Sequence, residues 1–224
     1  MSASLTLQTL NPLLDLFVSS NLDVTNANVK DFIVQPCTMR EIKEFVVHWH
    51  YSHNLRGMMC SHAFKMTYQG SLIGAMIYGR PAMANAWKKY TDQQDDLLEL
   101  RRLCCIDQTP RNTESYFIGK TLRWLKKNTD LKVIVSYADP HYGHGGIIYK
   151  ASNFEYRGQT SAGKVISYNG RLFHDKCIRD GKKKDENGNQ ILDKYAIELR
   201  EALKTGEAQW IETPGKHIYV YKLR

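Results

Sequence analysis

Residues 97–128 read LLELRRLCCIDQTPRNTESYFIGKTLRWLKKN, an apolar run followed by a polar turn and a second partly apolar segment. The first ten residues, 97–106, are mostly apolar and predict a long strand. A turn with proline and asparagine at 107–112 ends the strand. Thr113 can cap a helix, and apolar side chains then recur at helical spacing from Phe117 to Leu125. The stretch therefore predicts a strand, a turn and a helix in succession.

The same alternation continues on both sides of this stretch. The elements predicted before it are a strand at 31–35, a helix that starts with the capping box Thr38-Met39-Arg40-Glu41, and a hairpin at 62–78. Those predicted after it are a strand at 131–138, a short helix at 147–152, a strand at 154–159, a hairpin turning at Asn169-Gly170, a charged loop at 179–189, a helix at 191–203 and a hairpin around Thr213-Pro214-Gly215. We expect an α/β fold with a mixed, partly parallel central sheet flanked by helices, and a C-terminal helix and hairpin extension.

The length of 224 residues suits one substantial core. We expect one catalytic domain at 31–224 and an accessory segment at 1–30, in which residues 13–18 could form a short amphipathic helix. The sequence has no apolar run of about 18 residues and no signal-peptide pattern, so neither a membrane span nor secretion is expected. None of the five cysteines forms a Cys-x-x-Cys pair, which fits reduced thiols in a cytoplasm.

The charge balance favours a polyanionic partner. The chain carries 31 Lys and Arg against 23 Asp and Glu, a net charge of +8, and its sequence pI is about 9.2. Each phosphate that a Lys or Arg neutralises releases a condensed counterion, so a basic excess favours nucleic acid. A solvated basic surface without a partner explains the same excess equally well.

The element order is that expected of the GNAT acyltransferase superfamily. In that superfamily the central strand and the following helix start hold the pyrophosphate of acyl-coenzyme A, since exposed N–H groups there form an anion site. The resemblance therefore implies acetyl-coenzyme A or a related acyl-coenzyme A as cofactor. The usual glycine-rich turn is absent, and Glu114 has the wrong sign beside phosphates. The matching cofactor-binding candidates are Arg102, Leu103, Cys104, Arg111, Asn112, Thr113 and Ser115.

A second resemblance rests on three stretches. They are SYADPHYGHGGIIYKASNFEYRG at 136–158, HYSH at 50–53 and PGKHIYV at 214–220. Together they resemble the Mom family of bacteriophage DNA-modification proteins over about 31–224, most strongly at 139–158. The resemblance implies a GNAT-like fold, double-stranded DNA as partner, and conversion of adenine to an N6-methylcarbamoyl type that protects DNA from host restriction. It also implies a possible bound iron and a cytoplasmic location in an infected or lysogenic bacterium.

The residues make chemical sense for that reaction. The adenine amine is a poor nucleophile because its lone pair is delocalised, and Asp139 at the end of a buried strand could accept a hydrogen bond from it. Tyr142 could stack on an extruded base, and Tyr149 could protonate a thiolate leaving group. Tyr51 and His53 complete the catalytic candidates. The competing interpretations are a turn initiator for Asp139 and a core aromatic for Tyr149.

Two histidines are candidate metal ligands. His50 and His53 are three residues apart and could face the same way on one helix. Histidines in a last helical turn also gain from the helix dipole without any metal.

Basic residues with interleaved aromatics occur late in the chain and could follow a DNA backbone. The candidates are Arg157, Lys164, Arg171, Lys182 and Lys183, with Lys176, Arg179, Lys184, Lys216 and Lys222 around them. A solvated loop is the alternative for Lys182 to Lys184.

Three other functions remain open from the sequence. One is an ordinary GNAT N-acetyltransferase for a small amine or a protein. The second is an S-adenosylmethionine-dependent N6-adenine methyltransferase, because residues 139–142, DPHY, approximate the Asp-Pro-Pro-Tyr motif of those enzymes. The third is a basic DNA-binding module without activity, for which no helix-turn-helix or zinc-finger pattern is present.

Overall fold

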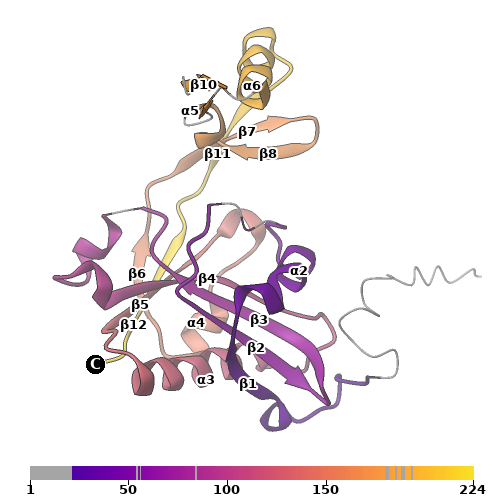
Figure 1. Ribbon diagram of the computed structural model, residues 1–224, viewed down its shortest axis with the longest axis vertical. Coiled ribbons are helices and arrows are strands. Elements are labelled where there is room, and N and C mark those ends of the chain that lie inside the picture. The colour runs from indigo at the N-terminus through magenta and orange to yellow at the C-terminus, as the bar shows by residue number, and fades with distance from the viewer. Residues whose placement is uncertain are drawn as a thin grey trace, which may run out of the picture. The chain divides into compact units, whose positions relative to one another are not determined.

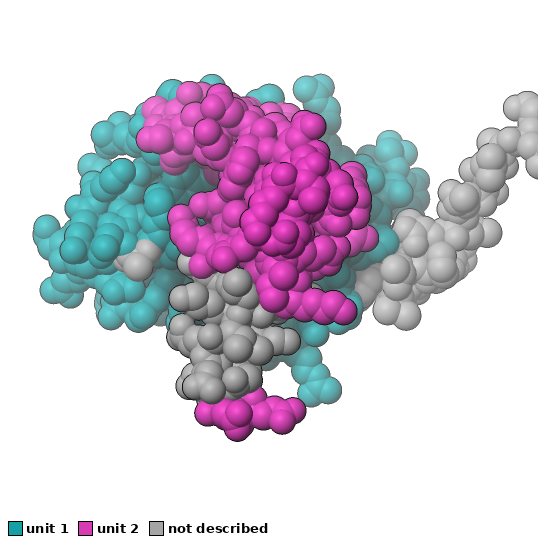
Figure 2. Space-filling model, turned by 90° about the horizontal axis from the view of Figure 1, so that it is seen from above, with its two compact units in different colours: residues 1–137, 146–157, 218–224 teal, residues 138–145, 158–217 magenta. Residues whose placement is uncertain are grey.

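The computed structural model describes residues 22–224 except 54, 56, 84, 180, 181, 185, 188, 189 and 193. The chain divides into two compact units, coloured separately in Figure 2 and described here one at a time. Unit 1 comprises residues 1–137, 146–157 and 218–224, and unit 2 comprises residues 138–145 and 158–217. The helix expected at 13–18 lies outside the described residues.

Helices and strands alternate through most of the described chain (Figure 1). In order they are η1 (Val29–Asp31), β1 (Ile33–Cys37), α2 (Met39–Trp49), β2 (His62–Tyr68), β3 (Ser71–Gly79), η2 (Ala86–Lys89), η3 (Gln94–Asp96), β4 (Leu97–Cys105), α3 (Thr113–Asn128), β5 (Val133–Ala138), η4 (Pro140–Tyr142), α4 (Ile147–Ala151), β6 (Glu155–Gln159), β7 (Gly163–Tyr168), β8 (Arg171–His174), α5 (Lys176–Arg179), β9 (Lys182–Lys184), β10 (Gln190–Leu192), α6 (Lys194–Thr205), β11 (Gln209–Thr213) and β12 (His217–Lys222).

The main sheet has the strand order β1-β2-β3-β4-β5-β12-β6. Strands β1 to β4 pair antiparallel with their neighbours in sequence, whereas β4 and β5 pair parallel. The mixed, partly parallel sheet expected from the sequence is therefore confirmed, and so are the hairpin β2–β3 and the strand–turn–helix of residues 97–128.

Strand β3 is the centre of the core, because helices pack on this apolar strand. The Tyr78 hydroxyl is 2.7 Å from the Thr121 hydroxyl of α3, which in turn lies 3.3 Å from the Met76 sulfur. Helix α2 packs on β3 and β4 as well. It begins at the predicted capping box, where the backbone N–H of Thr38 donates to the Glu41 carboxylate at 2.7 Å. The predicted start of α2 is thus confirmed.

Strands β4 and β5 separate after a short paired segment. In the described chain Leu97, Leu98 and Glu99 pair with Val133, Ile134 and Val135, and both strands continue beyond that point. On the other side of β4 the register with β3 shifts, since Ile77 pairs with Arg102 but Tyr78 pairs with Leu100. Arg101 is therefore the extra residue of a β-bulge, a feature that bends a strand and redirects its side chains.

Unit 2 has its own sheet and core. Its strands follow the order β11-β7-β8, and Ile166 is buried with Leu199, Ala202 and Ala208. The predicted hairpin turn is confirmed, because Asn169 and Gly170 both have positive φ, 48° and 69°, as a type I′ turn requires.

Three predictions for the C-terminal part of the chain are corrected. No hairpin forms around residues 213–215, because β11 pairs with β7 whereas β12 lies in the main sheet. Gly215 instead lets the chain approach Thr160, whose carbonyl oxygen would lie 1.9 Å from an added Cβ. The helix expected at 191–203 begins at Lys194, because residues 190–192 pair with β9 as strand β10. The charged loop expected at 179–189 is interrupted by strand β9, which pairs with β10.

No helix among the described residues is both long and apolar enough to cross a membrane.

Replacing either of two glycines of unit 1 with alanine should have opposite effects on the stability of the fold. Gly146 has φ +74°, and an added Cβ would lie 2.2 Å from the Tyr219 ring, whereas an added Cβ at Gly119 in α3 meets only the Arg123 side chain, at 3.5 Å. We expect Gly146→Ala to lower the free energy of unfolding by about 2–4 kcal/mol. Gly119→Ala should raise it by about 0.5–1 kcal/mol. Urea denaturation measures both, and equal effects of the two substitutions would contradict the placement of these glycines.

Candidate active site

Tyr149 lies at the point where β4 and β5 separate. The Ser136 hydroxyl of β5 donates to the carbonyl oxygen of Leu100 at 3.3 Å, and Tyr149 hydrogen-bonds to Ser136. The Tyr149 ring is 8% exposed and packs against the rings of Phe154 and Tyr219, with centroids 5.5 and 5.2 Å away. Burial raises the pKa of Tyr149 to about 12. The phenol therefore keeps its proton at neutral pH and can donate it.

A buried carboxylate accompanies this tyrosine. Glu99 of β4 is 9% exposed, accepts the backbone N–H of Ala82 at 3.0 Å and pairs with Arg101 Nε at 3.4 Å. Its charge adds to the rise of the Tyr149 pKa. We did not single out Glu99 from the sequence. The available signal was one acidic residue in the otherwise apolar run 97–100, which points to a partnered or functional carboxylate.

Two further candidates of unit 1 lie near this group. Tyr51 is 42% exposed, stacks on His50 at 4.3 Å, and interacts electrostatically with both Tyr149 and Arg102. Burial lowers the pKa of the half-buried Arg102, and its Nε has no hydrogen-bond partner in the described part of the chain. The structure thus brings Tyr51, Tyr149 and Arg102 together, with Glu99 as an unpredicted neighbour.

The histidine pair does not form the expected helical face. Helix α2 ends at Trp49, so His50 is its C-cap, and His53 follows with a positive φ of 45°. Nδ1 of His50 lies 2.8 Å from the Ser52 hydroxyl, and Nδ1 of His53 lies 3.0 Å from the Val47 carbonyl oxygen. No group of three His, Cys, Asp or Glu side chains that could hold a metal occurs among the described residues. The iron that the resemblance implied as possible therefore has no matching ligand set among these residues.

The start of α3 has no side-chain cap. Asn112 is its N-cap in a left-handed conformation, φ 69°, and makes no side-chain capping hydrogen bond. Thr113 is therefore the first helical residue and not the predicted cap. Its hydroxyl donates to the Pro110 carbonyl at 2.6 Å and does not cap the helix. The Ser115 hydroxyl likewise donates to the Asn112 carbonyl at 3.0 Å. First-turn N–H groups without a side-chain cap can bind phosphate, and the exposed Arg111 lies next to them.

The remaining cofactor candidates lie on β4. Leu103 and Cys104 pair with Met76 and Ala75 of β3. Cys104 is 8% exposed, and burial raises the pKa of its thiol to about 12. Cys104 is therefore a core residue and not part of the α3 start.

In unit 2, Asp139 follows the end of β5 and has two fixed partners. One carboxylate oxygen accepts the backbone N–H of His141 at 3.1 Å, and the other pairs with the Lys216 ammonium at 3.0 Å. Two hydrogen bonds to Thr160 fix the backbone of Lys216. The Thr160 N–H donates to the Lys216 carbonyl, and the Lys216 N–H donates to the Thr160 hydroxyl, both at 2.9 Å. The Asp139 side chain is 11% exposed. The sequence did not pair Asp139 with Lys216.

Tyr142 stands on the same turn as Asp139. Its backbone N–H donates to the Asp139 carbonyl at 3.1 Å, and that of His144 does so at 3.2 Å. The Tyr142 ring is 47% exposed and lies edge-on to His141 at 5.1 Å. A fixed backbone thus presents an accessible aromatic ring in unit 2, as base stacking requires.

Two of the late basic candidates are paired with acidic residues. Arg157 pairs with Glu155 at 2.7 Å and Lys164 with Glu212 at 3.8 Å, whereas Arg171 is exposed. The side chains of Lys182 and Lys183 lie outside what the structure describes.

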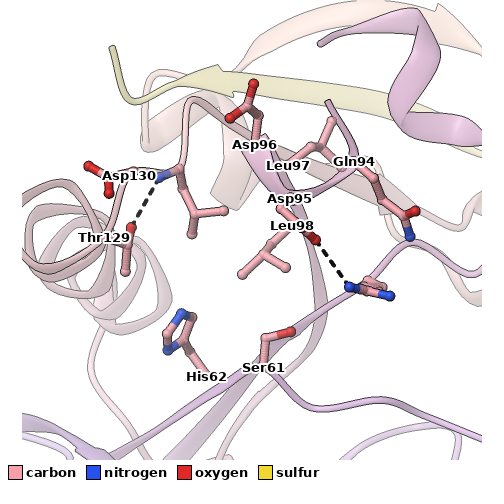
Figure 3. A pocket seen from close by; sticks show the side chains of 11 residues that line it. Ser61, His62, Gln94, Asp95, Asp96, Leu97, Leu98, Thr129 and Asp130 are labelled. Atoms are coloured by element: carbon pink, nitrogen blue, oxygen red, sulfur yellow. Dashed lines mark hydrogen bonds and ion pairs between the residues drawn. The ribbon is translucent and has the colours of Figure 1, made fainter. Parts of the chain in front are cut away.

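A cavity of about 380 Å³ in unit 1 contains none of the expected site residues (Figure 3). His62, Leu98 and three aspartates are among its lining residues. Each aspartate is ion-paired: Asp95 with Arg80 at 3.1 Å, Asp96 with Lys132 at 2.9 Å and Asp130 with Arg224 at 3.5 Å. These carboxylates serve local ion pairs, and the cavity carries no functional assignment.

Comparison with known proteins gives one family and one curated relative. The model of the Mom protein family matches residues 31–224. A methylcarbamoylase, Mom of Escherichia phage Mu, is 26% identical over 120 residues, which are 52% of this chain and 49% of the relative. The chain thus matches about half the length of that relative.

Solved acetyltransferases are also similar at low identity. An N-acetyltransferase from Staphylococcus aureus Mu50 is 11% identical with a TM-score of 0.44, over 86% of this chain and 97% of that one. A Bacillus subtilis acetyltransferase in complex with coenzyme A is 9% identical with a TM-score of 0.45, over 86% of this chain and 98% of that one.

The environment of Tyr149 predicts a pH dependence of stability. Its pKa is about 12 in the folded chain against 10.0 for a free tyrosine, so the folded state prefers the neutral phenol. This stabilisation is complete below pH 10 and is lost as the pH rises toward 12. Relative to Tyr149→Phe, the wild-type protein should lose about 1.4 kcal/mol per pH unit in this window. Denaturant titrations at pH 9, 10 and 11 test this, and parallel pH curves for the two proteins would refute the buried phenol.

Proposed function

Because the chain belongs to the Mom protein family, we propose that it is a transferase that modifies the N6 amino group of adenine in double-stranded phage DNA. The proposed product is a methylcarbamoyl-type adenine, the modification for which the phage Mu relative is named. It would protect the DNA from restriction in the cytoplasm of the bacterial host. The observation that carries the proposal is the buried, protonated Tyr149 hydroxyl beside Ser136 and Glu99.

The proposed cofactor is acetyl-coenzyme A or a related acyl-coenzyme A, which when bound would supply an acyl carbon activated as a thioester. Attack by N6 would form the new N–C bond and release coenzyme A as a thiol. The amide nitrogen of a methylcarbamoyl-type product would come from a separate nitrogen donor, because a thioester contains none. The start of α3 fits its pyrophosphate, because N–H groups without a side-chain cap and the exposed Arg111 favour an anion. The unpaired Nε of Arg102 offers a further donor in unit 1. Glu114 in the first turn opposes this binding. We expect the positive charges of Arg111 and Arg102 to outweigh the negative charge of Glu114.

Tyr149 is proposed as the general acid. Its high pKa keeps the hydroxyl protonated at pH 7, so the proton is available for a leaving sulfur. Ser136 holds the hydroxyl in place by a hydrogen bond. We assign Tyr51 to contacts around this hydroxyl, because it interacts electrostatically with Tyr149.

Asp139 is proposed to accept the proton that N6 loses as its bond to carbon forms. The adenine amine needs such an acceptor because its lone pair is delocalised into the ring. The ion pair with Lys216 and the bond from His141 fix the direction of the carboxylate. Lys216 is therefore a positioning residue for Asp139, and Tyr142 is proposed to stack on the extruded base.

Mass spectrometry of deoxynucleosides from plasmid DNA co-expressed with the protein tests the proposal. We expect a deoxyadenosine of increased mass with the wild-type chain. Asp139→Asn and Tyr149→Phe should each reduce it by about 100-fold or more, the usual contribution of acid–base groups. An unmodified deoxyadenosine pool would refute the function, and a gain of one methyl group would indicate a methyltransferase.

Tyr168→Phe is the matched control, because it removes the same hydroxyl from a tyrosine that donates to Glu198 at 3.1 Å in unit 2. The product should persist in this variant. Loss of product in Tyr168→Phe equal to that in Tyr149→Phe would contradict the specific role of Tyr149.

A further inference from the structure

We propose that the solvent face of α3 binds the phosphate backbone of the substrate DNA. We call the side chains of Lys120, Arg123, Lys126 and Lys127 the α3 basic face. The inference rests on the proposed function for its partner, a DNA duplex, and it assigns the duplex a binding surface other than the late basic residues.

The charge excess of the chain is concentrated in unit 1. The residues of unit 1 include 20 Lys and Arg against 13 Asp and Glu, whereas unit 2 has 11 against 10. Unit 2 is therefore almost neutral, although the lysine-rich stretch 182–184 belongs to it. A surface that binds a polyanion by counterion release needs a local excess of cations, and this points to unit 1.

Ion pairing distinguishes the α3 basic face from three of the late basic residues. Lys164, Arg179 and Lys216 of unit 2 are ion-paired with Glu212, Asp175 and Asp139. The four cations of the α3 basic face are exposed and form no ion pair among the described residues. The acidic residues next to them in the sequence are Glu114, six residues before Lys120, and Asp130, which pairs with Arg224.

Helix geometry places the four cations on one face. At 100° per residue, Lys120, Arg123 and Lys127 fall within about 60°, and Lys126 lies about 60° beyond Arg123. The opposite face, which includes Phe117, Thr121 and Leu125, is buried against the sheet. Lys120 and Lys127 are about 10 Å apart along the axis, a length over which B-DNA presents about six phosphates on its two strands.

The helix dipole explains only part of this arrangement. Cations in a last helical turn are stabilised by the carbonyl end of the helix, which accounts for Lys126 and Lys127. Lys120 and Arg123 lie in the middle of α3, where that effect has decayed. Lys120 additionally lies 5.2 Å from the centre of the Tyr116 ring, so an aromatic side chain adjoins the cations as in many nucleic-acid surfaces.

The salt dependence of DNA binding tests the inference. Fluorescence anisotropy of a labelled duplex, measured from 50 to 200 mM NaCl, gives the slope of log K against log salt concentration. In the triple variant Lys120→Gln, Arg123→Gln, Lys127→Gln the slope should become shallower by up to about 2.7, since each lost phosphate contact removes about 0.9. Glutamine preserves helix propensity, and an unchanged melting temperature confirms that the variant folds.

A second triple variant, Lys164→Gln, Arg171→Gln, Lys176→Gln, removes the same charge from unit 2. Its slope should differ from the wild-type slope by no more than about 0.9, the change expected for one phosphate contact. A wild-type slope in the α3 variant, or an equal change in both variants, would overturn the inference. If the wild-type protein binds DNA through α3 but yields no modified deoxyadenosine, the proposed function fails and the binding surface stands.

Discussion

The early separation of β4 and β5 is the constraint on which the candidate site depends. Once the parallel pairing ends at Glu99 and Val135, the carbonyl oxygen of Leu100 needs another donor, because an unsatisfied buried carbonyl is costly. Ser136 supplies it and also holds Tyr149. The bulge at Arg101 lies at the same point of β4 and places Arg101 beside Glu99. One interruption of a sheet thus gathers a protonated phenol, a carboxylate and two guanidinium groups.

In unit 2 the proposed functional carboxylate, Asp139, is fixed by hydrogen bonds and an ion pair. Asp139 has both oxygens engaged, and Lys216 reaches it because Gly215 allows the chain to lie against Thr160. Lys216 directly precedes β12 and Thr160 directly follows β6, so the ends of these two strands direct the carboxylate. The exposed Tyr142 shares that turn, so two proposed contacts to adenine follow from one local backbone arrangement.

Local patterns predicted much of the fold, because they act between residues close in sequence. The capping box at Thr38, the Asn169-Gly170 turn and the apolar strand 97–106 all formed as expected. Which strands pair is a matter of tertiary structure, so residues 213–217 joined two different sheets instead of forming a hairpin. The pair Asp139–Lys216 and the position of Glu99 beside Tyr149 were missed for the same reason. The helical placement of His53 was wrong because α2 ends at Trp49.

The start of α3, which lacks a side-chain cap, and the separated strands β4 and β5 are the proposed binding site of an acyl-coenzyme A. Thermal unfolding of the purified protein with added coenzyme A, and separately with S-adenosylmethionine, tests this directly. A ligand at 100 times its dissociation constant stabilises the folded state by about 2.7 kcal/mol. We therefore predict a saturable rise of the melting temperature with coenzyme A that is smaller in Arg111→Gln, and no rise with S-adenosylmethionine. An unchanged melting temperature with saturating coenzyme A, or stabilisation by S-adenosylmethionine, would contradict the account.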